Sequence, residues 1–414
     1  MGSLIDDETL LARAYLSRVA EPTSIPVWDW VRSVGPVAAA EAIRSGQVSA
    51  DVAAATDARR RAADPEADLE AARRHDIRLL VPESPDWPHF ALAALERTGR
   101  ARAATFLAGQ RRIADSGEPM PPLALWVRGP GDTSTLGIRS VAIVGARAAT
   151  AYGEHVTAEL AYGVAGQGVS VVSGGAYGID AAAHRCALAA GGQTVIVSAG
   201  GLDRPYPTGN SSIFDRAGES GLVISESPPG SAPQRHRFLT RNRLIAAFSA
   251  GTLVVEAARR SGAANTAAHA VTQGRPLMAV PGPVTSPMSA GCHDLLRRSA
   301  NPAVLVTSVE DVLAVVGAMG EGIDEPERDA PGDLRAELDR LDPIARRVFE
   351  GLPVRTAARP EAIAVRSGVS TVEVIRALPV LDLAGLVEVN DGGYRIAARL
   401  RKRTPAAPSP SVAP

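Results

Sequence analysis

The sequence predicts an α/β protein with an extended, doubly wound, mainly parallel sheet. A small helical domain is expected before the sheet and a winged-helix domain after it. Short apolar runs of strand length alternate with helical segments from Val141 onward, and glycines follow several of these runs. Alternation of this kind is typical of parallel strands joined by crossover helices on both faces of a sheet.

Residues 1–80 are expected to form the helical domain. Apolar spacing predicts helices over Leu10–Val19 and Val37–Ser45, and Asp57–His75 is a charged, alanine-rich helical stretch. Up to about residue 75, runs of β-branched and aromatic residues are scarce, so no sheet is expected there. The pattern fits a SAM-like or helix-hairpin-helix-like unit.

Residues 81–318 are expected to form the sheet domain. The predicted strands are Val141–Val144, Ser170–Val172, Thr194–Ser198, Leu222–Ser225, Thr252–Val255, Leu277–Val280 and Val304–Thr307. The helices predicted between them are Tyr152–Gly166, Ile179–Ala190, Asn210–Ala217, Arg241–Ala247, Asn265–Gln273 and His293–Arg298. The carboxyl ends of the strands line the binding crevice of such a sheet, so the glycine-rich segments after them mark the expected site.

The rest of the chain divides into a linker, a third domain and a tail. Residues 319–337 are rich in Gly, Pro and acidic residues, which predicts a linker. Residues 338–400 predict three helices and a hairpin, the winged-helix pattern; the helices are Pro343–Leu352, Arg359–Ser367 and Thr371–Leu383. Pro379 is expected to kink or shorten the third helix. Residues 401–414 are expected to be disordered.

Charge is balanced over the whole chain but not along it. The 44 basic and 45 acidic side chains give a formal net charge of -1, which excludes a globally basic nucleic-acid coat. Residues 227–298, however, hold nine arginines against Glu256 and Asp294, a net charge of +7. The positive charge is therefore concentrated in one part of the sheet domain.

Composition excludes several other classes of protein. With 45% hydrophobic residues, the chain is not expected to be disordered. Cys186 and Cys292 have no metal-site or disulfide spacing, no apolar run is long enough to span a membrane, and the N-terminus lacks a signal-peptide pattern. The dinucleotide and Walker A motifs are also absent. We expect a cytoplasmic protein with no membrane contact, no metal and no cofactor.

The first candidate site follows the first predicted strand. Gly145 ends this strand, and Arg147 precedes the helix expected from Tyr152. The N–H groups at a helix start and the forked donors of an arginine suit an anion such as phosphate. A plain strand-to-helix turn with a surface arginine explains the same residues equally well.

Two further loops carry candidate residues. The glycines of Ser173–Gly175 would let a ligand approach the backbone. Asp180 and His184 share a helix face, and we favour a structural pair that orients the turn over a general acid–base pair. Tyr206, between two prolines, is either a ring that stacks on a base or an aromatic packed in its loop.

The most informative stretch is residues 228–255, which contain four arginines, one phenylalanine within the arginine run and no acidic residue. These residues are Arg235, Arg237, Phe238, Arg241 and Arg243. Arginines can follow the phosphates of a nucleic acid while an aromatic ring stacks on its bases. The pattern therefore favours single-stranded nucleic acid over a solvated surface, which usually mixes both signs of charge.

The segment after the strand Thr252–Val255 offers small polar groups and one acid. Ser261 and Thr266 are possible phosphate donors, and Glu256 is expected to form a structural ion pair with Arg241 or Arg243. No Ser-His-Asp set, carboxylate dyad or metal cluster stands out, so no catalytic residue is predicted.

Across residues 140–300 these motifs form an ordered series. They are Val144–Arg147, Ser173–Asp180 with Ala183-His184, Gly201–Asp203 with Tyr206-Pro207 and Asn210, Ser225-Glu226 with Pro228–Gly230, Arg241–Arg243, Val255–Ala257 with Ser261-Gly262, and Val280–Gly282. Each motif alone is weakly specific, but the series is highly specific. In this respect the chain resembles the DprA (Smf) family of bacterial DNA-processing proteins.

The resemblance implies a non-enzymatic protein with an extended Rossmann-like domain. Family members are dimers that bind single-stranded DNA and load the RecA recombinase onto it in natural transformation and homologous recombination. By motif, the DNA pocket would be lined by Arg147, Ser173, Gly174, Gly175, Asn210, Arg241, Asn242 and Arg243. Basic positions of the family correspond to Arg235 or Arg237 and to Arg275, and Tyr206, Phe238, Ser261 and Gly262 complete the expected site.

Departures from the family pattern leave other functions open. Thr208 is neutral where members often carry a basic residue, and Ala263–Ala267 replaces a common Ser-Leu-Ile-Thr-Ala. Gly251-Thr252 with Glu256 is similar to a motif of nucleotide phosphoribohydrolases, but Ser249-Ala250 replaces their glycine pair. A transcription factor that reads duplex DNA with its winged helix is a third possibility, although the third helix of that domain holds one arginine against two acids.

Overall fold

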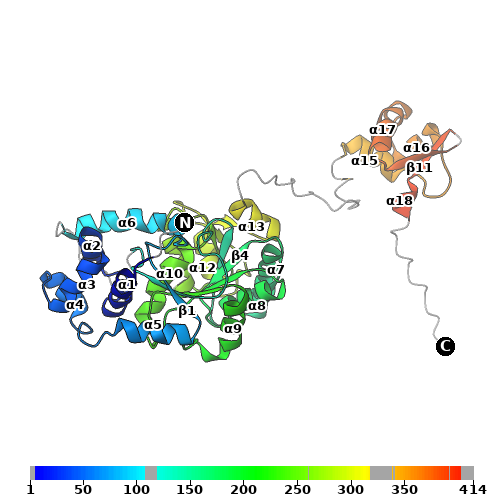
Figure 1. Cartoon of the computed structure of the whole chain (residues 1–414). Coiled ribbons are helices and arrows are strands. Elements are labelled where there is room, and N and C mark those ends of the chain that lie inside the picture. The colour runs from blue at the N-terminus through cyan, green and yellow to red at the C-terminus, as the bar shows by residue number, and fades with distance from the viewer. Residues whose placement is uncertain are drawn as a thin grey trace, which may run out of the picture. The chain divides into compact units, whose positions relative to one another are not determined.

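The structure is a computed structural model that describes residues 5–107, 119–259, 261–317, 338, 341–390 and 392–401. The chain divides into two compact units, Met1–Glu321 and Gly322–Pro414 (Figure 1). The predicted linker, and the predicted tail beyond residue 401, lie outside the described residues. The boundary expected near residue 80 falls inside the first unit and stays a prediction.

The first unit is built on a sheet whose described strands follow the order β1-β2-β6-β5-β4-β3-β7-β8-β9. From β6 across to β9 every pair of neighbouring strands is parallel, whereas β2 pairs with β6 in the antiparallel direction. The parallel strands are β3 Ser140–Val144, β4 Ser170–Ser173, β5 Thr194–Val197, β6 Leu222–Ser225, β7 Gly251–Val254, β8 Leu277–Ala279 and β9 Val304–Leu305. These match the seven predicted runs, and the doubly wound, mainly parallel α/β fold is confirmed.

The sequence analysis did not predict the two antiparallel strands on one side of the sheet. β1 (Ile77–Leu80) pairs with β2 (Leu125–Arg128), which pairs with β6. Each has four residues and lies before the region of regular alternation, so neither length nor periodicity separates it from other short apolar runs. β1 also lies within residues 1–80, where the sequence indicates only helices.

Helices cover both faces of the sheet, as a doubly wound fold requires. One core cluster joins the strands to α6 (His89–Leu107), α10 (Arg235–Ala247), α11 (Gly262–Thr272) and α12 (Ala290–Leu296). The opposite face is covered by α7 (Ala151–Gly166), α8 (Ile179–Ala189), α9 (Ser211–Ser220) and α13 (Val309–Val316). A 3-10 turn, η1 (Thr208–Asn210), precedes α9. α10 begins at Arg235 and not at Arg241, where the sequence pattern places its start.

The N-terminal part is helical, as predicted. Its helices are α1 (Asp7–Val19), α2 (Ile25–Val34), α3 (Pro36–Ser45), α4 (Ala50–Thr56) and α5 (Pro65–Arg74). A core of their own includes Tyr15, Leu16 and Ile43, whereas Ala14 and Ala72 join the sheet core beside β1 and β2. The helices are therefore packed directly on the sheet, and Figure 1 shows α2, α3 and α4 at the end away from α7 and α8.

From residue 341 to 401, the described part of the second unit has three helices, then a hairpin and then a short last helix. They are α15 (Pro343–Glu350), α16 (Pro360–Ser367), α17 (Thr371–Leu383), β10 (Val387–Asn390), β11 (Gly393–Ile396) and a last helix, α18 (Ala398–Arg401). This is the element order expected of a winged helix. α17 continues through Pro379, so the expected shortening does not occur, and its exposed residues include Val372, Ile375 and Leu383.

Other expectations from composition can be compared with the described ranges. None of their helices is both long and apolar enough to cross a membrane. Within the same ranges, no three His, Cys, Asp or Glu side chains gather in a way that would hold a metal ion. Cys186 and Cys292 are both free thiols, and burial raises the pKa of each.

His184 is fully buried in α8 between the helix and the sheet. Its Nδ1 lies 2.7 Å from the Thr194 hydroxyl, which donates its own proton to the Val171 carbonyl (2.9 Å). Nδ1–H is therefore the donor, and the bare Nε2 has no hydrogen-bond partner in the described structure. Burial, reinforced by the positive charge of Arg241, lowers the pKa of His184 to about 3.

We expect acid to destabilise the first unit through His184. The unfolded chain takes up the proton near pH 6.5, whereas folded His184 does so near pH 3, so stability is lost as the pH falls from 6.5 toward 3. At pH 5 the loss amounts to about 2 kcal/mol. All four tryptophans lie in this unit, so urea unfolding followed by their fluorescence at pH 7 and pH 5 measures the loss.

The control for this prediction is an exposed histidine. His184→Gln is expected to lose this part of the pH dependence, while His155→Gln, on the solvent side of α7, keeps it. Burial also lowers the pKa of His269, to about 4. Its contribution to the pH dependence of stability is the same in both variants. An unchanged pH dependence in His184→Gln would contradict the assignment.

Candidate nucleic-acid interface

The candidate site lies at the carboxyl edge of the parallel strands. β3 pairs with β4 on one side and β7 on the other, so the strand order reverses there. Ligands of doubly wound sheets bind in the crevice at such a switch point. The loops that meet at this edge carry Arg147 after β3, Gly174 after β4, Tyr206 after β5, and Ser261 beyond β7.

The buried guanidinium of Arg241 organises this edge. Its Nη1 donates to the carbonyl of Gly174 (2.7 Å), directly after β4, and to that of Val197, the last residue of β5. A Cβ on Gly174 would lie 2.4–2.8 Å from the guanidinium, so only glycine leaves room for it. Burial lowers the pKa of Arg241 to about 10, and the charge of Asp180 acts against that fall. Arg241 is itself buried, and these hydrogen bonds are to backbone carbonyls of the protein.

Asp180 and His184 do not form the pair that the sequence suggests. Asp180 is buried and accepts from the N–H of Gly174 (3.2 Å), whereas His184 bonds to Thr194. Burial raises the pKa of Asp180, against the opposing charge of Arg241. The two residues share a helix face but serve different partners, because β4 and β5 present a backbone N–H to one and a hydroxyl to the other.

Three exposed or half-exposed side chains form a row above this edge. The Arg147 guanidinium lies 5.3 Å from the centre of the Phe238 ring, and this ring lies 5.7 Å from that of Tyr206 at an angle of 52°. Tyr206 is 50% exposed, and Phe238 is half-buried at the start of α10. The structure thus brings together three predicted site residues, Arg147 and Tyr206 from two loops and Phe238 from the first turn of α10.

Tyr177 is an aromatic residue of this edge that the sequence analysis did not select. It is 51% exposed, and its ring lies against Gly209, where an added Cβ would be 2.7 Å from the tyrosine oxygen. Asn210 ties the two loops together through its amide, which donates to the carbonyls of Gly175 (2.9 Å) and Ala176 (3.1 Å). An aromatic within a glycine-rich turn after a strand was the available signal.

Arg243 and Asn242 are buried among protein groups. Arg243 is fully buried and donates to both oxygens of Glu226 (2.7 and 2.6 Å). Asn242 donates to Asn265 (3.0 Å) and more weakly to the Gly262 carbonyl (3.4 Å). Both therefore connect elements beneath the edge: the Arg243 guanidinium is fully buried, and the Asn242 amide nitrogen is bonded to protein oxygens.

Glu256 does not pair with Arg241 or Arg243, as the sequence analysis expected. Its carboxylate accepts from the hydroxyl (2.6 Å) and the backbone N–H (3.0 Å) of Thr150, the residue that caps α7. Both oxygens are thereby used, and the side chain is buried. A carboxylate occupied in this way is not placed to act on a nucleotide, which argues against the phosphoribohydrolase alternative.

The remaining predicted residues are two serines, two arginines of α10, and Arg275. Ser173 is buried and donates to the Ile143 carbonyl (2.6 Å), and Ser261 caps α11 in front of Gly262. Arg235 is exposed at the start of α10, whereas Arg237 is buried and faces the N-terminal helices. Only Arg235 of this group presents a charge at the surface.

Arg275 lies at the amino ends of the parallel strands, opposite the candidate site. It precedes β8, and its guanidinium is directed at the carbonyls of Gly137 and Ala247 (3.4 Å each), which precede β3 and β7. It also stands 5.4 Å from the ring of Phe90. Since these strands are parallel, Arg275 and Arg147 lie at opposite ends of the strands.

Comparison with known proteins identifies the family. A sequence profile described as DNA recombination-mediator protein A matches residues 111–317, half of the chain. A Mycobacterium tuberculosis chain that carries the DprA name is 50% identical over 394 residues, 94% of this chain and 95% of that one. The chain belongs to the DprA/Smf family. This family processes DNA in recombination.

Further DprA/Smf members support the assignment. The Smf protein of Escherichia coli is 35% identical over 285 residues, 68% of this chain and 72% of that protein. The X-ray structure of DprA from Streptococcus pneumoniae matches with 28% identity and a TM-score of 0.57, covering 75% of this chain and 98% of that one. The extended sheet domain is therefore shared with a solved DprA structure.

We expect Arg243→Ala to destabilise the first unit by about 3–5 kcal/mol, because it leaves Glu226 buried without its partner. Arg147→Ala, at an exposed position, is expected to change stability by no more than about 0.5 kcal/mol. Urea unfolding followed by tryptophan fluorescence measures both changes. An Arg243→Ala variant that is as stable as the parent would show that the ion pair is not structural.

Proposed function

We propose that the protein binds single-stranded DNA at the carboxyl edge of its sheet. The observation that carries this proposal is the row formed by Arg147, Phe238 and Tyr206. A guanidinium beside exposed rings combines a phosphate contact with faces on which bases stack. The family name and its role in DNA recombination agree with a DNA ligand.

The chemistry of this edge favours a single strand over a duplex. Bases of a duplex are stacked on one another, whereas those of a single strand present faces that an aromatic ring can cover. The rings of Tyr206 and Tyr177 are each about half exposed, 50% and 51%, on loops that Asn210 joins. We assign Tyr177 to the same interface, as a further stacking position beside Tyr206.

The fold separates arginines that touch DNA from arginines that build the site. Arg147 and Arg235 are exposed and are assigned to phosphates. Arg237, Arg241 and Arg243 are buried and bonded to protein groups, so they act on DNA only through the loops they hold. The sequence analysis expected all five arginines to contact DNA directly, whereas we now assign direct contacts to Arg147 and Arg235 alone.

The proposed biological role is to load RecA on single-stranded DNA as a homodimer, without catalysis. The absence of a catalytic motif and the occupied carboxylate of Glu256 support a binding function. For the dimer, β9 is the last strand of the sheet among the residues that the structure describes, and Val304 and Leu305 are 46% and 53% exposed. Such an apolar edge strand could pair with a second copy. The winged-helix unit is assigned to protein contact, since the exposed side of α17 carries apolar residues.

We expect Arg147→Ala to weaken binding to an oligo(dT) strand by about tenfold and to reduce the salt slope by about one. Phe238→Leu is expected to weaken it by roughly 5- to 150-fold with little change in slope, because it removes a stacking face and no charge. Fluorescence anisotropy over a series of salt concentrations measures both quantities.

Arg185→Ala, on the exposed side of α8, is the matched control for loss of one positive charge. It is expected to bind like the parent protein. Parent-like binding by both Arg147→Ala and Phe238→Leu would overturn the proposed interface, and absence of binding by the parent would overturn the proposed function.

We expect the protein to shorten the lag before RecA assembles on single-stranded DNA coated with single-strand-binding protein. RecA-dependent ATP hydrolysis follows this assembly directly. Arg147→Ala is expected to lengthen the lag again, because less protein is held on the strand. A lag that the parent protein leaves unchanged, at concentrations that saturate the DNA, would refute RecA loading while leaving DNA binding intact.

A further inference from the structure

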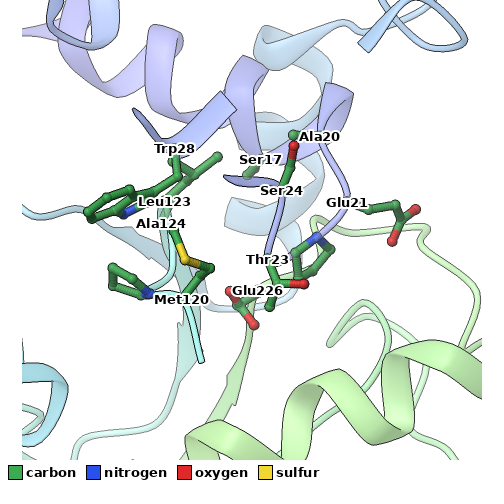
Figure 2. A pocket seen from close by; sticks show the side chains of 12 residues that line it. Ser17, Ala20, Glu21, Thr23, Ser24, Trp28, Met120, Leu123, Ala124 and Glu226 are labelled. Atoms are coloured by element: carbon green, nitrogen blue, oxygen red, sulfur yellow. The ribbon is translucent and has the colours of Figure 1, made fainter. Parts of the chain in front are cut away.

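The N-terminal helices contact the proposed DNA interface through Glu21 and Arg18. Glu21 lies in the connection between α1 and α2, at the rim of a hollow that this connection forms with the segment carrying Glu226. Figure 2 shows Glu21 directed away from Glu226 and from the other labelled side chains. Its charge is therefore available to a different element of the sheet domain.

That element is the first turn of α10. Glu21 accepts from Nε (3.0 Å) and Nη2 (2.6 Å) of Arg237 and lies 3.2 Å from Nε2 of His236, while Arg59 donates to the same carboxylate. The remaining Nη1 of Arg237 donates to the Ala232 carbonyl (3.1 Å). Burial works to raise the pKa of Glu21, but Arg237 and Arg59 outweigh it and hold the pKa at about 2.

The start of α10 lacks a local source of negative charge. Residues 235–237 are all basic or histidine, no acid lies in the first turn, and Gln234 makes no side-chain cap. Positive side chains are unfavourable there, because the free N–H groups of a helix start are already partly positive. Glu21 supplies the compensating charge from another element. Phe238 follows at once, so its position depends on this turn.

Arg18 of α1 anchors a second loop. Its Nη2 donates to the Pro229 carbonyl (2.7 Å), and its Nη1 lies 3.4 Å from the Ser231 hydroxyl. Asp68 holds the same guanidinium from α5 (2.8 Å to Nε). The loop before α10 is thereby bonded to α1 directly, in addition to the contact that Arg237 makes with Ala232.

This loop is in turn bonded to the one that carries Tyr206. The carbonyl of Ser231 accepts from Gly201 N–H (2.9 Å), and Gly230 N–H donates to Asp203 (2.7 Å). A short series of hydrogen bonds therefore connects α1 to the Tyr206 loop, just as Glu21 connects the helical unit to the turn before Phe238.

We propose that Glu21 and Arg18 are positioning residues of the single-stranded DNA interface, which set the spacing between the Phe238 and Tyr206 rings. This inference rests on the proposed function. It gives the N-terminal helices a defined role. They hold the first turn of α10 through Glu21, and through Arg18 they hold the loop before it, which is bonded to the Tyr206 loop.

Charge and positioning make opposite predictions for Glu21. Removing a negative charge beside a DNA interface would, by electrostatics alone, tighten binding and steepen its salt dependence. Loss of ring positioning weakens binding, and only where bases are present to stack. An abasic oligonucleotide has the same phosphates as oligo(dT) without the bases, so the pair of ligands separates the two effects.

The experiment compares Glu21→Gln, Arg18→Ala and Arg18→Lys by fluorescence anisotropy with both oligonucleotides at equal length. Glu83→Gln is the matched control. It removes the same charge from another ion pair of α1, that of Arg13 with Glu83 (2.5 Å), which lies outside the two connections described. Tryptophan fluorescence and thermal unfolding establish that each variant is folded.

We expect Glu21→Gln and Arg18→Ala to weaken oligo(dT) binding about 3- to 30-fold, within the range for partial loss of one stacked base. Binding of the abasic strand is expected to stay within about twofold. Arg18→Lys keeps a donor for Pro229 and is expected to recover part of the loss, and Glu83→Gln to bind like the parent. Combining Glu21→Gln with Phe238→Leu is expected to add little, because both act through one ring.

Other results would overturn the inference without touching the proposed function. Tighter binding of both oligonucleotides by Glu21→Gln would show that Glu21 masks the basic residues. Parent-like binding by both variants, with Phe238→Leu still impaired, would show that the rings are held without the N-terminal helices. Failure of the proposed function itself has a different signature, namely no effect of Phe238→Leu or no binding by the parent.

Discussion

The carboxyl edge of the sheet depends on one buried guanidinium, that of Arg241. It satisfies the carbonyls that close β4 and β5 and occupies the space that a side chain on Gly174 would fill. A buried positive charge is costly unless it is hydrogen-bonded and offset, and the nearby carboxyl of Asp180 opposes the fall in its pKa. The turn that faces the proposed DNA site is therefore shaped from within the protein, by a residue that is itself buried.

The same principle extends to the other arginines of the basic stretch. Arg243 is matched by Glu226 and Arg237 by Glu21, and in each case both carboxylate oxygens are used. A guanidinium offers a planar fork of donors, so it can join two elements that a lysine would contact at a single point. The chain contains a single lysine. Arginine joins elements in the interior, and it is also the residue that we propose for anion contacts at the surface.

The N-terminal helices belong to this arrangement and are not merely attached to it. They share the sheet core through Ala14 and Ala72. The connection between α1 and α2 also brings the negative charge of Glu21 to the start of α10, whose first turn has no acidic residue. The proposed interface would consequently be composite: its rings and arginines come from the sheet domain, and the contacts that position them come from a helical unit more than 200 residues earlier in the sequence.

The sequence by itself determined the parallel strands, most crossover helices, the family and the loops that form the site, because apolar period and glycine placement are local signals. It did not determine which arginines face solvent. Arg235 and Arg237 are two residues apart and chemically identical, yet one is exposed and the other buried against Glu21. The start of α10, the partner of Glu256 and the location of Arg275 were likewise decided only by tertiary structure. In each case the deciding group comes from a distant segment, and no local pattern records which carboxylate or carbonyl will lie beside a given side chain.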